Sequence, residues 1–112
     1  MNASDILDLT VAILQQSVTK MMTFEWHKKV EKLPNDEEKK NAKLLLADCE
    51  WARIVLENAQ LDEISQDLQD NEDALKKGRD ALKKALERLD SVKNVLNAAN
   101  SLLSIVSKIV KL

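Results

Sequence analysis

Two side chains in this sequence have the chemistry that active sites use most often, one histidine (His27) and one cysteine (Cys49). Glu31 follows His27 by about one helical turn, so this pair offers a two-ligand fragment of a metal site. A di-iron helical bundle needs the Glu-x-x-His pattern on two helices, and a chain with one histidine cannot supply it. One histidine and one cysteine also fall short of a zinc site. We therefore interpret His27 as a surface or partly buried side chain beside lysines.

The cysteine falls within an apolar run, where a thiol behaves as a small hydrophobic side chain. Its neighbours Asp48 and Glu50 are acids, which raise a thiol pKa rather than activate the sulfur as a nucleophile. The single glycine excludes a glycine-rich phosphate loop. We expect Cys49 to lie in the core, and we expect no enzyme: no catalytic residue, no cofactor and no metal.

Composition limits the elements that could position a site. The 112 residues are the length of one domain, 32% are charged and 45% are hydrophobic, with one Gly and one Pro. Because turns depend on such residues, an all-β sandwich or barrel is close to excluded. The composition predicts one all-α domain over residues 1–112.

The net charge, the lack of a long apolar stretch and the acidic residues near the N-terminus argue against three further classes of protein. The net charge of −2 argues against nucleic acid as a partner. No stretch of eighteen residues is free of polar groups, so no ordinary transmembrane helix is expected. Asp5 and Asp8 stand where a signal peptide would carry positive charge. These features predict a cytoplasmic protein.

An apolar stripe at spacings of three and four predicts a first helix over residues 4–33, which Asn2 or Ser4 can cap and Pro34 closes. Asn35 and Glu38 resemble a capping box at the start of a second helix. The short connection predicts an antiparallel hairpin that places Trp26 opposite Ala42 and Trp51 opposite Ser17. The stripe consists of Leu7, Val11, Leu14, Val18, Met22, Trp26, Val30 and Leu33.

From Leu61 onward the sequence follows a heptad pattern whose weakest positions are Asn71 and Gly78. Taken alone, this pattern predicts one helix of about fifty residues that needs another chain to cover it. Charge favours a different arrangement, because acids dominate residues 44–75 and bases dominate residues 76–88. A fold-back near Asn71 pairs these blocks, with Asp67 facing Lys76 and Glu63 facing Arg79.

We therefore expect three long helices, about 4–33, 35–69 and 72–112. They would form an antiparallel up-down-up three-helix bundle with coiled-coil-like packing. The uninterrupted helix from Leu61 remains the alternative.

The C-terminal segment is broadly apolar and has no acidic residue after Asp90. Four of seven heptad positions are apolar, which is wider than a helix needs to cover one core, so this helix requires neighbours on more than one side. Its narrow polar strip consists of Asn94, Asn97, Asn100, Ser101, Ser104, Ser107, Lys108 and Lys111.

Three interpretations of this segment compete: a helix buried within the monomer, an oligomer seam or docking face, and an interfacial membrane helix. We expect a non-enzymatic helical protein–protein interaction or assembly module, whose partner is a second copy or another helical protein. The alternative is a membrane-associating protein acting through the acid-free amphipathic tail 91–112. The expected interaction residues are Leu96, Leu102, Leu103, Val106, Ile109 and Val110.

Overall fold

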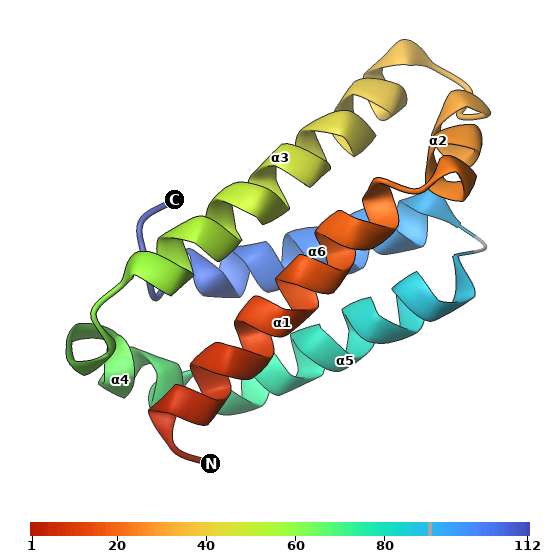
Figure 1. The fold of residues 1–112 in the computed structure, drawn as a ribbon. Helices are drawn as coiled ribbons and strands as arrows, with labels where there is room; N and C mark the ends of the chain where they lie inside the picture. The colour runs from red at the N-terminus through yellow and green to blue at the C-terminus, as the bar shows by residue number, and fades with distance from the viewer. Residues whose placement is uncertain (90) are drawn as a thin grey trace.

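The computed structural model describes residues 1–89 and 91–112, and within them every regular element is an α-helix (Figure 1). The all-α prediction is confirmed. Buried apolar side chains from all of these helices form one core. The helices are α1 (Ala3–Met21), α2 (Phe24–Glu31), α3 (Asp36–Asn58), α4 (Leu61–Asp70), α5 (Glu72–Arg88) and α6 (Val92–Val106).

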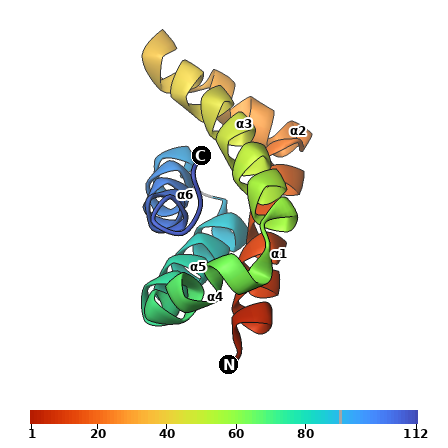
Figure 2. The ribbon, with the colours of Figure 1, turned by 90° about the vertical axis from the view of Figure 1, so that its left-hand side faces the viewer.

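Four helices, α1, α3, α5 and α6, form a ring around the core. Helix α1 packs against α3 and α5, and α6 packs against the same two helices from the other side (Figure 2). Helices α1 and α5 point one way along the molecule, and α3 and α6 point the other way (Figure 1). The expected three long helices are thus divided into shorter ones, and only the first reversal, between α2 and α3, lies where it was expected.

The first division separates α1 from α2 at Thr23. The Thr23 hydroxyl donates to the Lys20 carbonyl at 2.7 Å and accepts from the Trp26 backbone N–H at 3.3 Å, so it caps α2. The continuous helix over 4–33 is therefore wrong. The buried stripe of α1 lies partly one residue earlier than expected along its whole length, so Met21 is buried while Met22 is 66% exposed.

The hairpin that joins α2 to α3 agrees more closely with the prediction from the sequence. The Asn35 side chain accepts from the Glu38 backbone N–H at 2.8 Å and caps α3, while Trp26 and Ala42 are both buried. The expected partner of Ser17 is wrong, because Ser17 is buried and Trp51 is 52% exposed. Trp51 lies off the buried stripe of α3, which consists of Ala42, Leu45, Cys49, Ala52 and Leu56.

The expected fold-back near Asn71 is also wrong. A helix boundary does lie where it was expected, since α4 ends at Asp70 and α5 begins at Glu72. The chain, however, already reverses between α3 and α4, at Ala59 and Gln60, and it bends again at Asn71 rather than folding α5 back along α4 (Figures 1 and 2). The Asn71 side-chain amide donates to the Asp67 carbonyl at 2.8 Å, so this side chain satisfies the end of α4 rather than the start of α5.

The ion pairs that motivated the fold-back are not formed. Among the described residues, the pairs within 4.0 Å join the Met1 amino group to Glu72, and Arg53 to Glu50 and Glu57. Exposed ion pairs contribute little to stability. Burial of apolar side chains contributes more, and both α4 and α5 bury theirs, Leu68 and Leu75 among them.

The third reversal separates α5 from α6 at Leu89, so the uninterrupted helix from Leu61 is not formed either. Leu89 has a left-handed backbone with φ 46°, and its side chain is buried. A left-handed conformation is costly for a residue with a Cβ, so side-chain burial stabilises this turn against that cost. Ser91 then caps α6 by accepting from the Asn94 backbone N–H at 3.3 Å.

Candidate functional site

Most of the residues expected to bind a partner are in the monomer core. Helix α6 packs against both α5 and α3, as its broad apolar face predicted, and its polar strip is exposed. It ends at Val106, so the single helix expected over 72–112 is wrong at this end too. Four of the six residues are buried (Leu102, Leu103, Val106 and Ile109) and two are half-buried (Leu96 and Val110).

Two of the large apolar side chains that remain exposed lie on one face of α3. Leu44 is 49% exposed and Trp51 is 52% exposed, and they are seven residues apart with Asp48 between them. This spacing places all three on one face of the helix. The sequence offered a signal for this face, because Leu44 and Trp51 are large apolar residues that fall outside the buried stripe of α3.

This face of α3 borders a hollow shared with α6. One part, of about 370 Å³, is lined by Leu44 and Asp48 from α3 and by Leu96 and Asn100 from α6. An adjoining part, also about 370 Å³, is lined by Asp48, Trp51, Asn100 and Leu103. Asp48 and Asn100 border both parts, so they form one continuous depression, which we call the α3–α6 groove.

The two helices that form the walls of the α3–α6 groove contribute lining residues at the same spacing. Helices α3 and α6 run in the same direction (Figure 1), and each contributes residues at i, i+4 and i+7. The groove is therefore lined by two helical faces, which is an arrangement that accepts a further helix.

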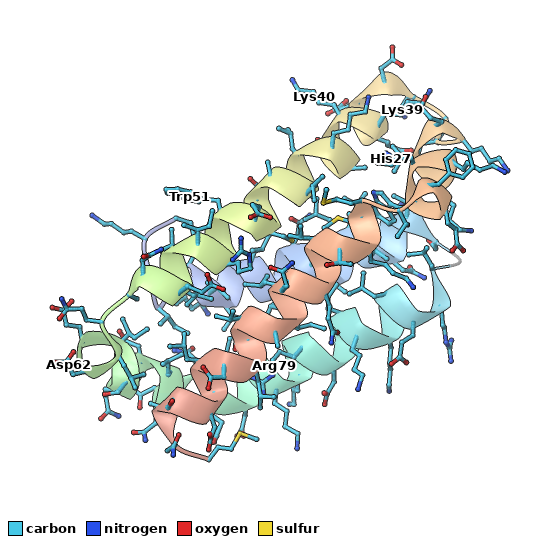
Figure 3. The ribbon with its side chains drawn as sticks, in the orientation of Figure 1. His27, Lys39, Lys40, Trp51, Asp62 and Arg79 are labelled. Atoms are coloured by element: carbon cyan, nitrogen blue, oxygen red, sulfur yellow. The ribbon has the colours of Figure 1, made fainter. Side chains whose placement is uncertain are left out.

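The far end of the groove is closed by the C-terminal residues. The Trp51 indole N–H donates to the backbone carbonyl of Leu112 at 3.4 Å, and Figure 3 shows Trp51 on the outer side of α3. Leu112 also lines the groove and is 46% exposed. The indole ring thus keeps an apolar face at the surface although its polar N–H has a partner.

The side chains with chemistry of their own lie elsewhere and apart. His27 is exposed on α2 (Figure 3), in agreement with its interpretation as a surface or partly buried side chain. Within residues 1–89 and 91–112, no three His, Cys, Asp or Glu side chains are grouped so that they could hold a metal ion. Cys49 is fully buried, as expected, and burial raises the pKa of its thiol to about 12, with a smaller contribution from Asp48.

The tail 91–112 is placed so that its apolar side chains face protein. Val95, Ala99, Leu102 and Val106 are completely buried, so this face reaches lipid only if α6 leaves the bundle. None of the described helices combines the length and the apolar character needed to cross a bilayer.

The α3–α6 groove is therefore the candidate site: it combines exposed large apolar side chains, a continuous hollow and a polar rim of uncharged and charged residues. The rim includes Glu38 and Asn41 on α3 and Lys93 and Asn97 on α6. Comparison with protein-family models, curated proteins and solved structures finds no match for this chain.

Proposed function

We propose that this chain is a non-enzymatic helical assembly module, and that two copies associate through the α3–α6 groove. The exposure of Trp51 and Leu44, two helical turns apart on the wall of this groove, is the observation that carries the proposal. Tryptophan is enriched among the residues that dominate binding energy at protein interfaces. A contiguous exposed apolar patch in a folded monomer marks an interaction surface.

The charges of the groove favour a second copy as the partner. The rim carries acids on α3 (Glu38 and Asp48) and a base on α6 (Lys93), so it contains both signs. In a two-fold symmetric contact each surface meets its own copy, and the α3 of one protomer lies over the α6 of the other. Acids then face a lysine across the interface in both halves.

The residues expected from the sequence enter this proposal in two ways. Leu96 and Leu103 line the groove, so they contact the partner directly. Leu102 and Val106 lie beneath them in the core, where they hold α6 in place against α5. Charged substitutions at Leu102 or Val106 therefore unfold the monomer and do not test the interface.

The test is the oligomeric state of groove variants, measured by sedimentation equilibrium over a concentration series. The variants are Trp51→Glu and Leu44→Glu, which alter exposed positions and leave the core intact. The matched control is Phe24→Glu, because Phe24 is 76% exposed on α2, away from the groove. Helix content, followed by circular dichroism, confirms that each variant folds.

We expect the unmodified chain and Phe24→Glu to dimerise, and both groove variants to be monomeric with unchanged helix content. A monomeric unmodified chain at every concentration overturns the proposal. Dissociation by Phe24→Glu to the same extent as by Trp51→Glu also overturns it, because the effect would then come from added charge rather than from the groove.

A further inference from the structure

Arg79 on α5 is a buried cation with few partners. The residue is 8% exposed, and Figure 3 shows it between α1 and α5. Its Nη1 donates to the Thr10 hydroxyl of α1 at 3.4 Å, which is the one hydrogen bond that the guanidinium makes to the described residues. A guanidinium has five N–H donors, so four of them have no protein acceptor in this part of the chain. Its unpaired nitrogens are not sealed in the core, so they are open to solvent or to a ligand in the adjoining hollow.

The charge of Arg79 is also incompletely balanced. No carboxylate of the described residues lies within 4.0 Å of it, and Glu72, the nearby acid, pairs with the Met1 amino group at 3.7 Å. Burial lowers the pKa of the guanidinium, and the attraction of Asp80 and Glu72 offsets only part of this effect. A buried cation without a paired anion is costly, so this position favours an incoming anion.

Arg79 opens into a hollow of about 300 Å³ between α1 and α5. Lys76 and Lys83 line the same hollow, three residues before and four residues after Arg79, so the three bases share one face of α5. Asp80 is the one acid in this lining. The hollow is therefore positive, although the chain as a whole carries a net charge of −2.

The opposite wall, formed by α1, is apolar. Leu9, Ala12 and Ile13 line the hollow, and Gln16 stands at its end. Gln16 and Lys83 also border a second hollow of about 500 Å³, which continues between α1 and α5 toward Thr19 and Leu86. The two hollows together form a depression, which we call the α1–α5 groove. Its part around Arg79 has a cationic wall and an aliphatic wall, whereas the part toward Thr19 is lined mostly by polar side chains, among them Lys20 and Glu87.

We propose that the α1–α5 groove binds an aliphatic monocarboxylate, with the carboxylate on Arg79 and the hydrocarbon chain along Leu9, Ala12 and Ile13. The planar guanidinium donates two parallel N–H groups, a geometry that matches a carboxylate. An aliphatic monocarboxylate fits better than inorganic phosphate, because phosphate has no hydrocarbon chain to cover Leu9, Ala12 and Ile13. Thr10 holds the guanidinium in place from below.

The test is a titration of the ¹⁵N-labelled full chain with octanoate, followed by NMR. The Arg79 Nε–Hε signal reports on the head group, and the backbone amides of α1 and α5 report on the chain. Two further probes separate the contributions: 1-octanol has the chain without the charge, and inorganic phosphate has charge without the chain. We expect saturable shifts of Arg79 Nε–Hε with octanoate, and at least about tenfold weaker binding of either other probe.

The variants are Arg79→Gln and the matched control Lys84→Gln. Lys84 is a base on the same helix, but it lines the hollow between α5 and α6. We expect Arg79→Gln to weaken octanoate binding about tenfold or more, since it removes a charge-assisted pair, and Lys84→Gln to leave it within about twofold. If Arg79→Gln fails to fold, the exposed pair Lys76→Gln and Lys83→Gln replaces it, with binding expected to weaken severalfold.

Three results overturn the proposal. The first is the absence of saturable shifts with octanoate, and the second is equal binding of 1-octanol, which would show a purely apolar site. The third is equal weakening by Lys84→Gln, which would show attraction to the general charge of α5. The α1–α5 groove lies on different helix faces from the α3–α6 groove, so failure here leaves the dimer proposal unaffected.

Discussion

Gly78 on α5 lies directly against Leu102 on α6. A Cβ atom added to Gly78 would lie 3.1 Å from Leu102 Cδ1 and 3.6 Å from Leu102 Cα. Helices α5 and α6 therefore pack closely because position 78 has no side chain, and the weakest position of the heptad pattern is a point of contact between helices.

Substitution of Gly78 by a large residue should separate these helices. We expect Gly78→Leu to lower the free energy of unfolding by about 1–3 kcal/mol, because overpacking forces neighbouring side chains and backbone to shift. Urea denaturation measures this change. Ala81→Leu is the control, since Ala81 is exposed on the same helix. Equal stability of the Gly78→Leu and Ala81→Leu variants would contradict the close packing.

The buried thiol of Cys49 should make stability depend on alkaline pH. Burial raises its pKa from 9.0 to about 12, so between these values the unfolded chain releases a proton that the folded chain retains. The contribution of this thiol to the free energy of unfolding is fully present below pH 9. It falls as the pH rises toward 12, by at most about 1.4 kcal/mol per pH unit.

Comparison with Cys49→Ala isolates this effect, because the two proteins differ only in the thiol. The difference in unfolding free energy between the unmodified chain and Cys49→Ala should be constant below pH 9 and should decrease above it. A difference that stays constant up to pH 11 would show that the thiol ionises without opening the fold.

Substitutions at two of the predicted interaction residues, Leu102 and Leu96, should affect different properties, the first the stability of the monomer and the second its association. We expect Leu102→Ala to cost about 2–5 kcal/mol of unfolding free energy, because Leu102 is completely buried. Leu96→Ala, at a half-buried position on the groove wall, should cost less than about 1 kcal/mol and should weaken dimerisation instead. Thermal unfolding and sedimentation equilibrium of both variants measure the two effects. A larger stability loss in Leu96→Ala than in Leu102→Ala would contradict the assignment of α6 faces.

The all-helical fold and much of its core followed from periodicity, whereas the places where the chain reverses did not. Apolar spacing located buried residues such as Leu14, Leu68 and Val106, because helices form where an apolar stripe can be covered. The turn at Leu89 has no local signal, since a left-handed leucine is stabilised by burial that only the tertiary fold provides.

The expected interaction residues on the heptad face of the C-terminal helix are mostly in the monomer core for a similar reason. The width of the α6 apolar face was visible in the sequence, but the number of helices available to cover it depended on where the chain turned. Once α3 and α5 both cover α6, little of that face remains, and the surplus apolar surface appears at Leu44 and Trp51. Their position outside the buried stripe of α3 was the available signal.

Binding to lipid should require loss of the native packing of α6. The apolar residues of the tail 91–112 lie mostly in the core, and an interfacial helix binds in proportion to the apolar area that it can expose. We expect the folded full chain not to float with anionic vesicles of phosphatidylserine and phosphatidylcholine. The Leu102→Ala variant, which weakens the attachment of α6, should float in a fraction that rises as temperature approaches its unfolding midpoint. Flotation of the unmodified chain to the same extent, at a temperature where circular dichroism shows it fully folded, would demonstrate a lipid-binding surface on the native bundle and would favour a membrane role over assembly.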